Sequence, residues 1–292
     1  MKSGVWSYFR SSHHSTLHSS LSTLQNMSII TQKQGTLEYL TAEGITAPHC
    51  FTTRHGGVSV GTQSSLNLAY GRGDSMENVE ANIRILGQAL GFDTGKLVLT
   101  RQTHSNIVRV VSASDHAGLC HRDYPECDAL VTNAPGVALM VFTADCTPLL
   151  FHDPVTGAVG AAHAGWRGTA QGIGAKTVQA MVENLGSKPE NIHAANGPNI
   201  AQCHFETDSD VPDSMRAAFG EEVDAYIEKR GEKYYLDLKR INALILRRAG
   251  VTHIEISDAC TYCQCDRFWS HRVTKGERGS QGAVIVCKEV AK

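Results

Sequence analysis

Short runs of apolar and β-branched residues recur along most of this sequence, and Gly, Pro, Asn or Asp bounds most of them. Runs of this length and composition predict β-strands. The predicted strands cover 97–99, 107–111, 129–131, 137–142, 148–151, 158–162, 192–195, 253–257 and 283–287. Because several of them follow one another with no helix between, a regular alternation of strand and helix is disfavoured.

Helical periodicity is confined to a few longer stretches that stand apart from most of the strands. The predicted helices cover 76–90, 168–186, 212–229 and 237–249. Their N-caps are expected at Asp74 or Ser75, at Asp213 and at Asp237. Left-handed glycines are expected at the C-terminal ends, at Gly91, Gly186 and Gly250. This order of elements predicts an α+β fold layered from mixed sheets and helices.

The composition is that of a globular chain with a near-neutral balance of charge. Of the 292 residues 41% are apolar, which is enough for a substantial core, and we treat 28–292 as one domain. Lys and Arg total 27 against 29 Asp and Glu, a balance that gives no electrostatic footprint for nucleic acid or an anionic membrane. No apolar run approaches the roughly 20 residues of a membrane-spanning helix. We expect a cytoplasmic monomer or small homo-oligomer that acts on a small molecule.

Residues 1–27 differ from the rest, because they hold eight Ser and three His but no acidic residue. We expect a disordered or non-native N-terminal extension there. An acid-free, Ser-rich start fits a transit peptide, but the segment has one Arg and one Lys, and translation from Met27 explains it equally well. The pair His13 and His14 is therefore a weak metal candidate.

Nine cysteines form an odd set in a chain without a secretory signal, which argues against a disulfide framework. We expect reduced thiols. Metal binding, nucleophilic chemistry or simple burial then remains for each of them.

Three short segments at the ends of predicted strands carry the candidate chemistry. They are RQTH (101–104), TADCTP (143–148) and AHAGWRG (162–168). Imidazole and thiolate are preferred zinc ligands, and three protein ligands with an open fourth position form the catalytic arrangement. His104, Cys146 and His163 are therefore candidate zinc ligands, and zinc held there would make hydroxide available near neutral pH. The alternative is that both histidines are hydrogen-bonded core residues and Cys146 is a buried thiol.

A second possible site lies in CTYCQC, where Cys260, Cys263 and Cys265 precede His271. Four ligands within twelve residues are typical of a closed structural zinc or cluster site. The alternative is that part of this set is incidental.

These segments, together with others between Phe51 and Cys287, resemble the YfiH family, which is also called the laccase-domain or multicopper polyphenol oxidase family. The resembling stretches are FTTRHGGVS (51–59), SLNLAYGRGD (65–74), TRQTHSNIV (100–108), CDALVT (127–132), TADCTPLLFHDP (143–154), GAVGAAHAGWRGTAQGI (157–173), GPNI (197–200) with Glu206, and CTYC with FWSHR (260–272). Many motifs in the same order make the resemblance specific, although only Cys260 of the CTYCQC cysteines falls on a family position.

The resemblance implies an α/β/β/α layered fold and a zinc site at His104, Cys146 and His163. It also implies phosphorolysis of purine nucleosides, namely adenosine, inosine, guanosine and methylthioadenosine, with adenosine deamination as a companion activity. Purine nucleosides and phosphate are then the partners, and copper is an adventitious or alternative metal. The implied catalytic residues are Cys146, Asp145, Arg54, Arg167 and Glu206, and the implied substrate-binding residues are Arg54, Asn67, Arg167 and His271.

Phosphorolysis requires cations and amide donors around a phosphate. Glycines close to Arg54 and Arg167 suit this role. The residues alone favour turn-capping or surface arginines, whereas the family resemblance favours phosphate contacts. The family usually carries Arg where this chain has Val273 and Ser280. If those charges hold phosphate, Arg278 or Lys275 is the candidate replacement.

Other mechanisms stay open. Deamination needs a proton carrier, for which Asp145, Asp128 and Glu206 are candidates, although each could instead orient a ligand histidine; the usual deaminase signature H-x-E with P-C-x-x-C is absent. Cys146 and His163 could form a Cys–His amide hydrolase of the peptidoglycan-precursor editing type. A copper-dependent polyphenol oxidase is disfavoured because no H-x-H pair occurs.

A non-catalytic binding module stabilised by zinc is a further alternative. It is disfavoured because a site with three protein ligands and an open position is typical of catalysis.

Overall fold

Two six-stranded mixed sheets form the centre of the computed structural model, which describes residues 28–115 and 125–288. The N-terminal segment 1–27, with His13 and His14, lies outside the described residues, as does most of the stretch 112–127. The first sheet has the order β1 (Ile29–Gln34), β2 (Leu37–Ala42), β3 (His49–Thr52), β15 (Gln281–Val286), β7 (Ala138–Thr143) and β4 (Leu97–Leu99).

The second sheet has the order β14 (His253–Ile256), β10 (His193–Asn196), β8 (Thr147–His152), β9 (Val159–Ala164), β6 (Ala129–Thr132) and β5 (Val108–Val110). Most neighbours in both sheets are antiparallel, but the pairs β4–β7, β5–β6 and β10–β14 are parallel. A small third sheet joins β11 (Glu206–Thr207), β13 (Lys233–Leu236) and β12 (Ile227–Arg230).

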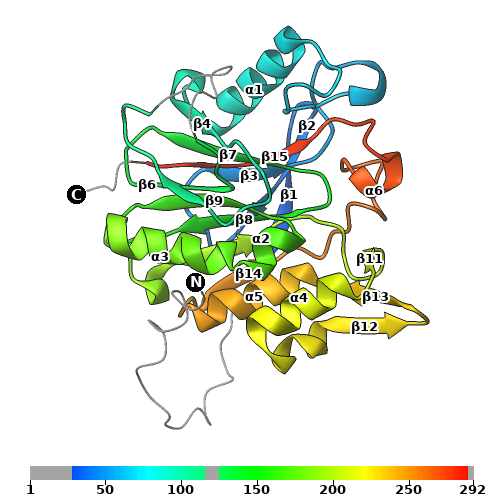
Figure 1. Cartoon of the computed structure of the whole chain (residues 1–292). Coiled ribbons are helices and arrows are strands. Elements are labelled where there is room, and N and C mark those ends of the chain that lie inside the picture. The colour runs from blue at the N-terminus through cyan, green and yellow to red at the C-terminus, as the bar shows by residue number, and fades with distance from the viewer. Residues whose placement is uncertain (1–27, 116–124, 289–292) are drawn as a thin grey trace.

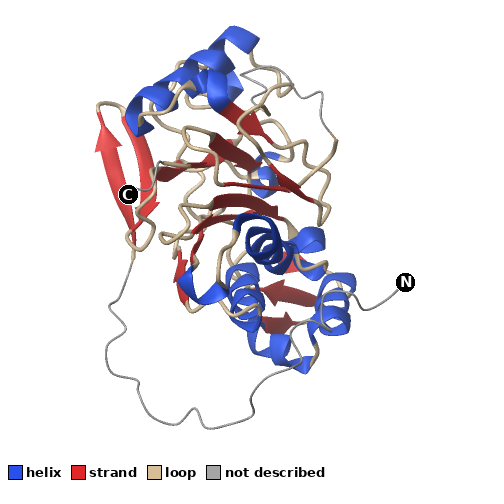
Figure 2. Cartoon of the chain, turned by 90° about the vertical axis from the view of Figure 1, so that its left-hand side faces the viewer, coloured by secondary structure: helices blue, strands red, loops and turns tan. Residues whose placement is uncertain are grey.

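Apolar packing holds the sheets and helices in four layers (Figures 1 and 2). Leu139 of β7, Ala161 of β9 and Ile285 of β15 belong to the core between the two sheets. On the outer face of the first sheet, helix α1 (Met76–Leu90) buries Ile83 and Leu86. Helices on the outer face of the second sheet complete the α/β/β/α architecture, which confirms the predicted fold class.

Every residue of β7, β8, β9 and β15 is buried. Strands covered on both faces consist of near-continuous apolar runs, which is why the sequence pattern located these four. The strand β1 (IITQKQ) at the sheet edge is partly exposed along its length. Because β1 is mostly polar, a search for apolar runs does not find it.

Local sequence signals set the helix ends. The Ser75 hydroxyl caps α1 by accepting from the N–H of Asn78, and Gly91 ends it at φ 71°, as predicted. The predicted helix 168–186 is interrupted at Gly172, whose φ of 75° is left-handed. Two helices result, α2 (Trp166–Ala170) and α3 (Ile173–Leu185).

The predicted helix 212–229 is wrong in its second half. Helix α4 (Asp210–Phe219) ends at Gly220, where φ is 81°, so Asp213 lies in the first turn and is not the N-cap. The chain then forms a 3₁₀ turn and β12. Helix α5 (Leu238–Arg248) begins as predicted, because the Asp237 carboxylate accepts from the N–H of Arg240.

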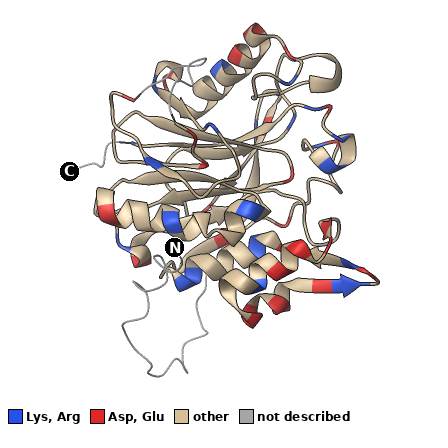
Figure 3. Cartoon of the chain, viewed as in Figure 1, with Lys and Arg blue, Asp and Glu red and all other residues tan. Residues whose placement is uncertain are grey.

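The remaining helical elements are α6 (His271–Thr274) and 3₁₀ turns at Gly61–Gln63, Thr94–Lys96, Pro189–Asn191 and Glu221–Tyr226. None of the helices in the described ranges is long and apolar enough to cross a membrane. Charged residues of both signs are interspersed over the outer helices and the β12–β13 hairpin, whereas the central strands carry few (Figure 3).

Candidate metal centre and pocket

Three metal-binding side chains meet where the chain crosses between the two sheets. His104 follows β4 on the crossing to β5, Cys146 lies between β7 and β8, and His163 lies in β9. Their ligand atoms all lie within 4.8 Å of one another. The structure therefore brings the three predicted ligands together at strand ends.

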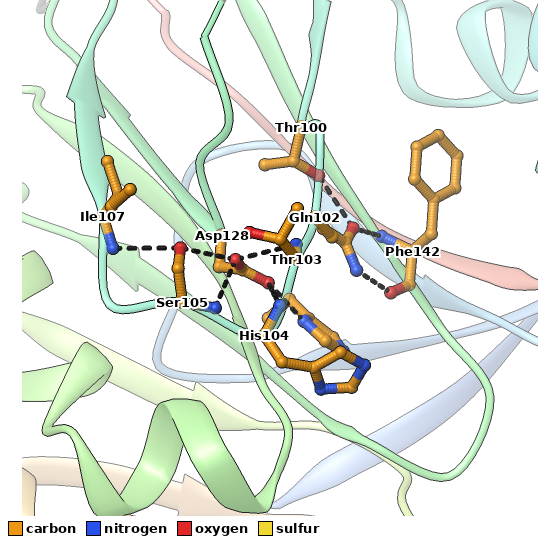
Figure 4. Close-up of polar contacts among 9 residues, drawn as sticks. Thr100, Gln102, Thr103, His104, Ser105, Ile107, Asp128 and Phe142 are labelled. Carbon is orange, nitrogen blue, oxygen red and sulfur yellow. Dashed lines mark hydrogen bonds and ion pairs between the residues drawn. The ribbon is translucent and has the colours of Figure 1, made fainter.

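The buried carboxylate of Asp128 organises this centre (Figure 4). It accepts hydrogen bonds from the backbone N–H groups of Thr103 (3.1 Å), His104 (3.1 Å) and Ser105 (2.7 Å), from the Ser105 hydroxyl (2.7 Å) and from Nδ1 of His163 (2.8 Å). Burial alone would raise the pKa of Asp128, but hydrogen bonds from His163 and Ser105 outweigh it and lower the pKa to about 2. The carboxylate is ionised and fixes two of the three ligands at once.

Because Nδ1 of His163 is engaged by Asp128, its Nε2 is the nitrogen directed at Cys146. Burial acts to lower the pKa of His163, yet the neighbouring Cys146 sulfur and the Asp128 carboxylate raise it to about 9. The three side chains thus form a Cys–His–Asp series. Carboxylates commonly orient metal-ligating histidines in this way.

Gln102 holds the His104 loop against the first sheet (Figure 4). Its Oε1 accepts from the N–H of Phe142 at 2.7 Å and its Nε2 donates to the Phe142 carbonyl at 2.8 Å. His104 itself has a φ of 60°, a left-handed conformation that non-glycine residues adopt rarely.

Gly165 gives the ligands the space that they occupy. A Cβ at this position would lie 2.6 Å from Nδ1 of His104 and 3.1 Å from Sγ of Cys146. Two imidazoles and one cysteine sulfur around a cradle that tolerates no side chain fit a metal ion with three protein ligands and an open position.

Asp145, next to Cys146, has both carboxylate oxygens engaged. One accepts from the Thr261 hydroxyl at 2.6 Å and the other from the backbone N–H of Arg272 at 2.7 Å. Its φ is 81°. Asp145 therefore joins the Cys146 turn to the C-terminal segment of the chain.

A polar pocket opens beside the centre. Its empty volume is ≈ 690 Å³ including the open mouth. The lining residues are Ala69, Tyr70, Arg72, Thr100, Gln102, His104, Phe142, Thr143, Ala144, Cys146, His163, Arg278 and Ser280.

Arg278 is a buried cation in this lining, 7% exposed. One terminal nitrogen donates to the Gly279 carbonyl at 2.8 Å and to the Ser280 hydroxyl at 2.9 Å, while its Nε has no hydrogen-bond partner. Burial, with the charge of Arg72 next in size, lowers the pKa of Arg278 to about 10. Within the described residues neither arginine has a carboxylate at ion-pair distance, so the pocket presents uncompensated positive charge.

Several residues singled out in the sequence lie outside the pocket lining. Arg54 donates to the carbonyls of Ser64 and Cys265 and stacks over Trp269, 4.0 Å from the ring centroid. Asn67 is fully buried and holds Ala69 and Ser280 by their backbone N–H groups. Both serve the framework behind the pocket in this structure, and their roles toward substrate remain predictions.

Three further candidates are exposed and are also not among the lining residues. Arg167 is exposed and stacks over Trp166. Glu206 is exposed and accepts from the Tyr235 hydroxyl at 2.6 Å. His271 is exposed in α6, and burial together with the charge of Arg278 lowers its pKa.

Sequence reasoning missed Arg72 and assigned no role to Tyr70, although both lie in the resembling stretch SLNLAYGRGD. Of the two positions where a family arginine was expected, Ser280 lines the pocket and Val273 is exposed in α6. Arg278, named from the sequence as a possible replacement, does line the pocket, whereas Lys275 does not.

The cysteines of CTYCQC lie apart from this pocket. Cys260 and Cys263 meet Cys203 and His204 in a second group, so the inclusion of Cys265 and His271 in that set was wrong. Partners from a distant segment replace them, because ligands are brought together by the fold and not by spacing alone.

Comparison with known proteins identifies the family. Residues 48–288 match the family described as multi-copper polyphenol oxidoreductase laccase. A protein of Deinococcus radiodurans named purine nucleoside phosphorylase is 44% identical over 250 residues, which cover 85% of this chain and 92% of that protein. The Escherichia coli protein named purine nucleoside phosphorylase YfiH is 36% identical over 226 residues, covering 77% of this chain and 88% of that protein.

The crystal structure of YlmD from Geobacillus stearothermophilus superimposes with a TM-score of 0.84 at 35% identity, covering 89% of this chain and 100% of that one. Sequence and fold agree. The chain therefore belongs to the YfiH family of laccase-like proteins.

Proposed function

We propose that the chain is a zinc-dependent purine nucleoside phosphorylase acting on adenosine, inosine, guanosine and methylthioadenosine, with adenosine deamination as a companion activity. The names of its relatives support phosphorolysis. The observation that carries the proposal is the juxtaposition of a three-ligand metal centre with the buried, uncompensated cation of Arg278 in one open pocket.

In phosphorolysis a phosphate oxygen forms a bond to C1′ of the sugar while the bond from C1′ to the base nitrogen breaks. The base leaves with the electron pair and takes up a proton, giving free base and sugar 1-phosphate. Arg278 and Arg72 would neutralise the phosphate and direct it into the pocket. Tyr70 and Phe142 offer aromatic surface in the same lining for a planar base. Zinc on His104, Cys146 and His163 would act as a Lewis acid.

The same centre offers less to deamination, which needs a proton carrier beside the attacking water. Both oxygens of Asp128 and of Asp145 already accept hydrogen bonds. Glu206 is not among the pocket-lining residues. We therefore expect adenosine deamination to be slower than phosphorolysis.

The test combines metal analysis with turnover. We expect zinc at His104, Cys146 and His163, and base release from inosine and adenosine that depends on phosphate. The His104→Ala variant should lose both that zinc and the activity. Base release that is independent of phosphate, or unchanged in the variant, would refute the phosphorylase. Copper in place of zinc, with oxidation of a phenol, would support the oxidase instead.

A Cys–His hydrolase is the second candidate, because Cys146, His163 and Asp128 have the order of a nucleophile, its base and an orienting carboxylate. Metal occupancy separates the two mechanisms, since a zinc-bound thiolate is a poor nucleophile. In metal-free protein Cys146 would react rapidly with iodoacetamide and amide substrates would be cleaved. Slow alkylation in zinc-loaded protein argues for the phosphorylase.

A further inference from the structure

A second cluster of metal-binding side chains lies away from the pocket. Cys203 and His204 belong to a turn after β10, and Cys260 and Cys263 to a turn after β14. A parallel bridge between Asn199 and Cys260 sets the two turns side by side. The ligand atoms of all four side chains lie within 4.8 Å of one another.

Two sulfur–sulfur distances in this group match the edges of a coordination tetrahedron, and two sulfur–nitrogen distances are slightly shorter than such an edge. Sγ of Cys203 lies 3.7 Å from Sγ of Cys260 and 3.7 Å from Sγ of Cys263. Tetrahedral zinc with a Zn–S distance of ~2.3 Å places two sulfurs ~3.8 Å apart and a sulfur and a nitrogen ~3.6 Å apart. Nδ1 of His204 lies 3.2 Å from Sγ of Cys203 and 3.3 Å from Sγ of Cys263. The sulfurs stand well beyond the ~2.05 Å of a disulfide.

The surroundings of the Cys260 sulfur suit a thiolate. Backbone N–H groups of Ala201, Tyr262 and Cys263 donate to Sγ of Cys260, and hydrogen bonds to a thiolate favour its charged form. The His204 ring stacks on Tyr262 with 4.0 Å between centroids, which holds its Nδ1 toward the sulfurs.

A buried lysine lies close enough to compensate the negative charge of a zinc ion bound by three thiolates. Lys239 is 5% exposed, donates from Nζ to the Ala259 carbonyl at 2.9 Å, and has no ion pair among the described residues. Three thiolates and a neutral imidazole around Zn²⁺ carry one net negative charge. Lys239 lies near enough to act electrostatically on Cys260 and Cys203.

We propose that Cys203, His204, Cys260 and Cys263 bind one structural zinc ion. Four protein ligands close the coordination sphere, which distinguishes a structural from a catalytic site. The ion would join two turns that are 57 residues apart from Cys203 to Cys260. It would stabilise the protein because the folded state alone presents the complete ligand set.

The two joined turns also hold the first centre. Thr261, beside Cys260, donates its hydroxyl to Asp145, and the guanidinium of Arg272 binds the carbonyl of Glu206 at 3.0 Å while its backbone N–H binds Asp145. Loss of the structural ion would therefore loosen the residue that precedes Cys146. We expect reduced turnover without loss of the metal bound by His104.

Metal counting by native mass spectrometry tests the proposal. Wild type should hold two zinc ions per chain, and His104→Ala and the double variant Cys203→Ser/Cys263→Ser one each. Cys265→Ser is the matched control on the same turn and should keep two. Wild type could instead hold a single ion that is lost in the double variant and kept in His104→Ala. That result would support the structural site and contradict a zinc ion at His104, Cys146 and His163.

A measurement on wild type alone covers the case in which the double variant does not fold. Cys203 and Cys263 are exposed, yet bound zinc should protect both from iodoacetamide until a chelator strong enough to strip the site is added. Equal alkylation with and without chelator would overturn the proposal. So would a disulfide between two of the three cluster cysteines in freshly purified protein, or a single zinc that only His104→Ala removes.

Discussion

Oδ1 of Asp128 lies 2.8 Å from Nδ1 of His163, and this contact sets which nitrogen of the histidine faces Cys146. The same carboxylate holds the backbone of the His104 loop. One buried side chain therefore positions a ligand in the β4–β5 connection and a ligand in β9, and its replacement should affect both.

Asp128→Asn should lower zinc affinity at the first centre by about 10- to 100-fold, the usual effect of removing a carboxylate that orients a ligand. Every partner of Asp128 is a donor, so an amide NH₂ in place of one oxygen must face N–H or O–H groups. Competition with a chromophoric chelator measures the affinity. Asp208→Asn, at an exposed pair with Lys233, is the control, and equal affinities in both variants would contradict the assignment.

Gly165→Ala should abolish metal binding at the first centre without straining the backbone, because φ at this residue is −66° and the added Cβ meets His104 and Cys146. Gly172→Ala is the complementary control. A Cβ at residue 172 would meet no atom within 4 Å apart from its chain neighbours, but φ there is +75°. The variant should therefore lose about 1 kcal/mol in free energy of unfolding and still bind zinc. Metal content and urea unfolding of both variants separate the steric from the conformational effect.

Arg278→Met should raise the KM for phosphate about 10- to 100-fold, since a hydrogen bond to a charged group contributes ~1.5–3 kcal/mol. The free energy of unfolding should change by less than about 1 kcal/mol, because a buried cation without a counter-ion is itself unfavourable.

Arg54→Met provides the contrast. Its guanidinium binds two carbonyls and stacks on Trp269, so we expect a loss of ~1–2 kcal/mol in stability and an unchanged KM for phosphate. The reverse pattern in the two variants would show that Arg54 is the phosphate ligand that the family resemblance implies.

Acid should destabilise the protein through His152 of β8. Burial, assisted by the neighbouring His193, lowers the pKa of this ring to about 4, below the unfolded value of ~6.5. Its neutral form therefore stabilises the fold above pH 6.5, and this contribution of about 3 kcal/mol is lost as the pH falls from about 6.5 towards 4. Urea unfolding between pH 7 and 5 should show a shallower pH dependence in His152→Gln than in wild type or in the exposed control His55→Gln.

The sequence predicted those parts of the fold whose signal is local. Strands β7, β8, β9 and β15 are buried along their whole length and mostly apolar, so they were located within one or two residues. Strands β1 and β12 are largely exposed and polar and carry no such signal. Gly220 shows the same limit in a helix, since the periodicity of 212–229 continued past the left-handed residue that ends α4.

For the candidate site, the sequence supplied the metal-binding side chains but not their partners. His104, Cys146 and His163 stand out by residue type and by the company of small residues. Asp128 was one of three candidate proton carriers that could instead orient a ligand histidine, and its position 2.8 Å from His163 assigns it the orienting role. Arg72 and Cys203 reach their neighbours by long-range packing, which spacing along the chain does not encode.

Two of the first centre's ligands lie on connections that pass from one sheet to the other: His104 between β4 and β5, and Cys146 between β7 and β8. The third, His163, belongs to the second sheet alone. A slide of the sheets by one strand spacing, about 4.8 Å, would exceed the distances that separate the ligands. The three side chains of the candidate metal centre therefore meet only when the interface between the sheets has formed, and the rate of metal uptake during refolding would report when that interface forms.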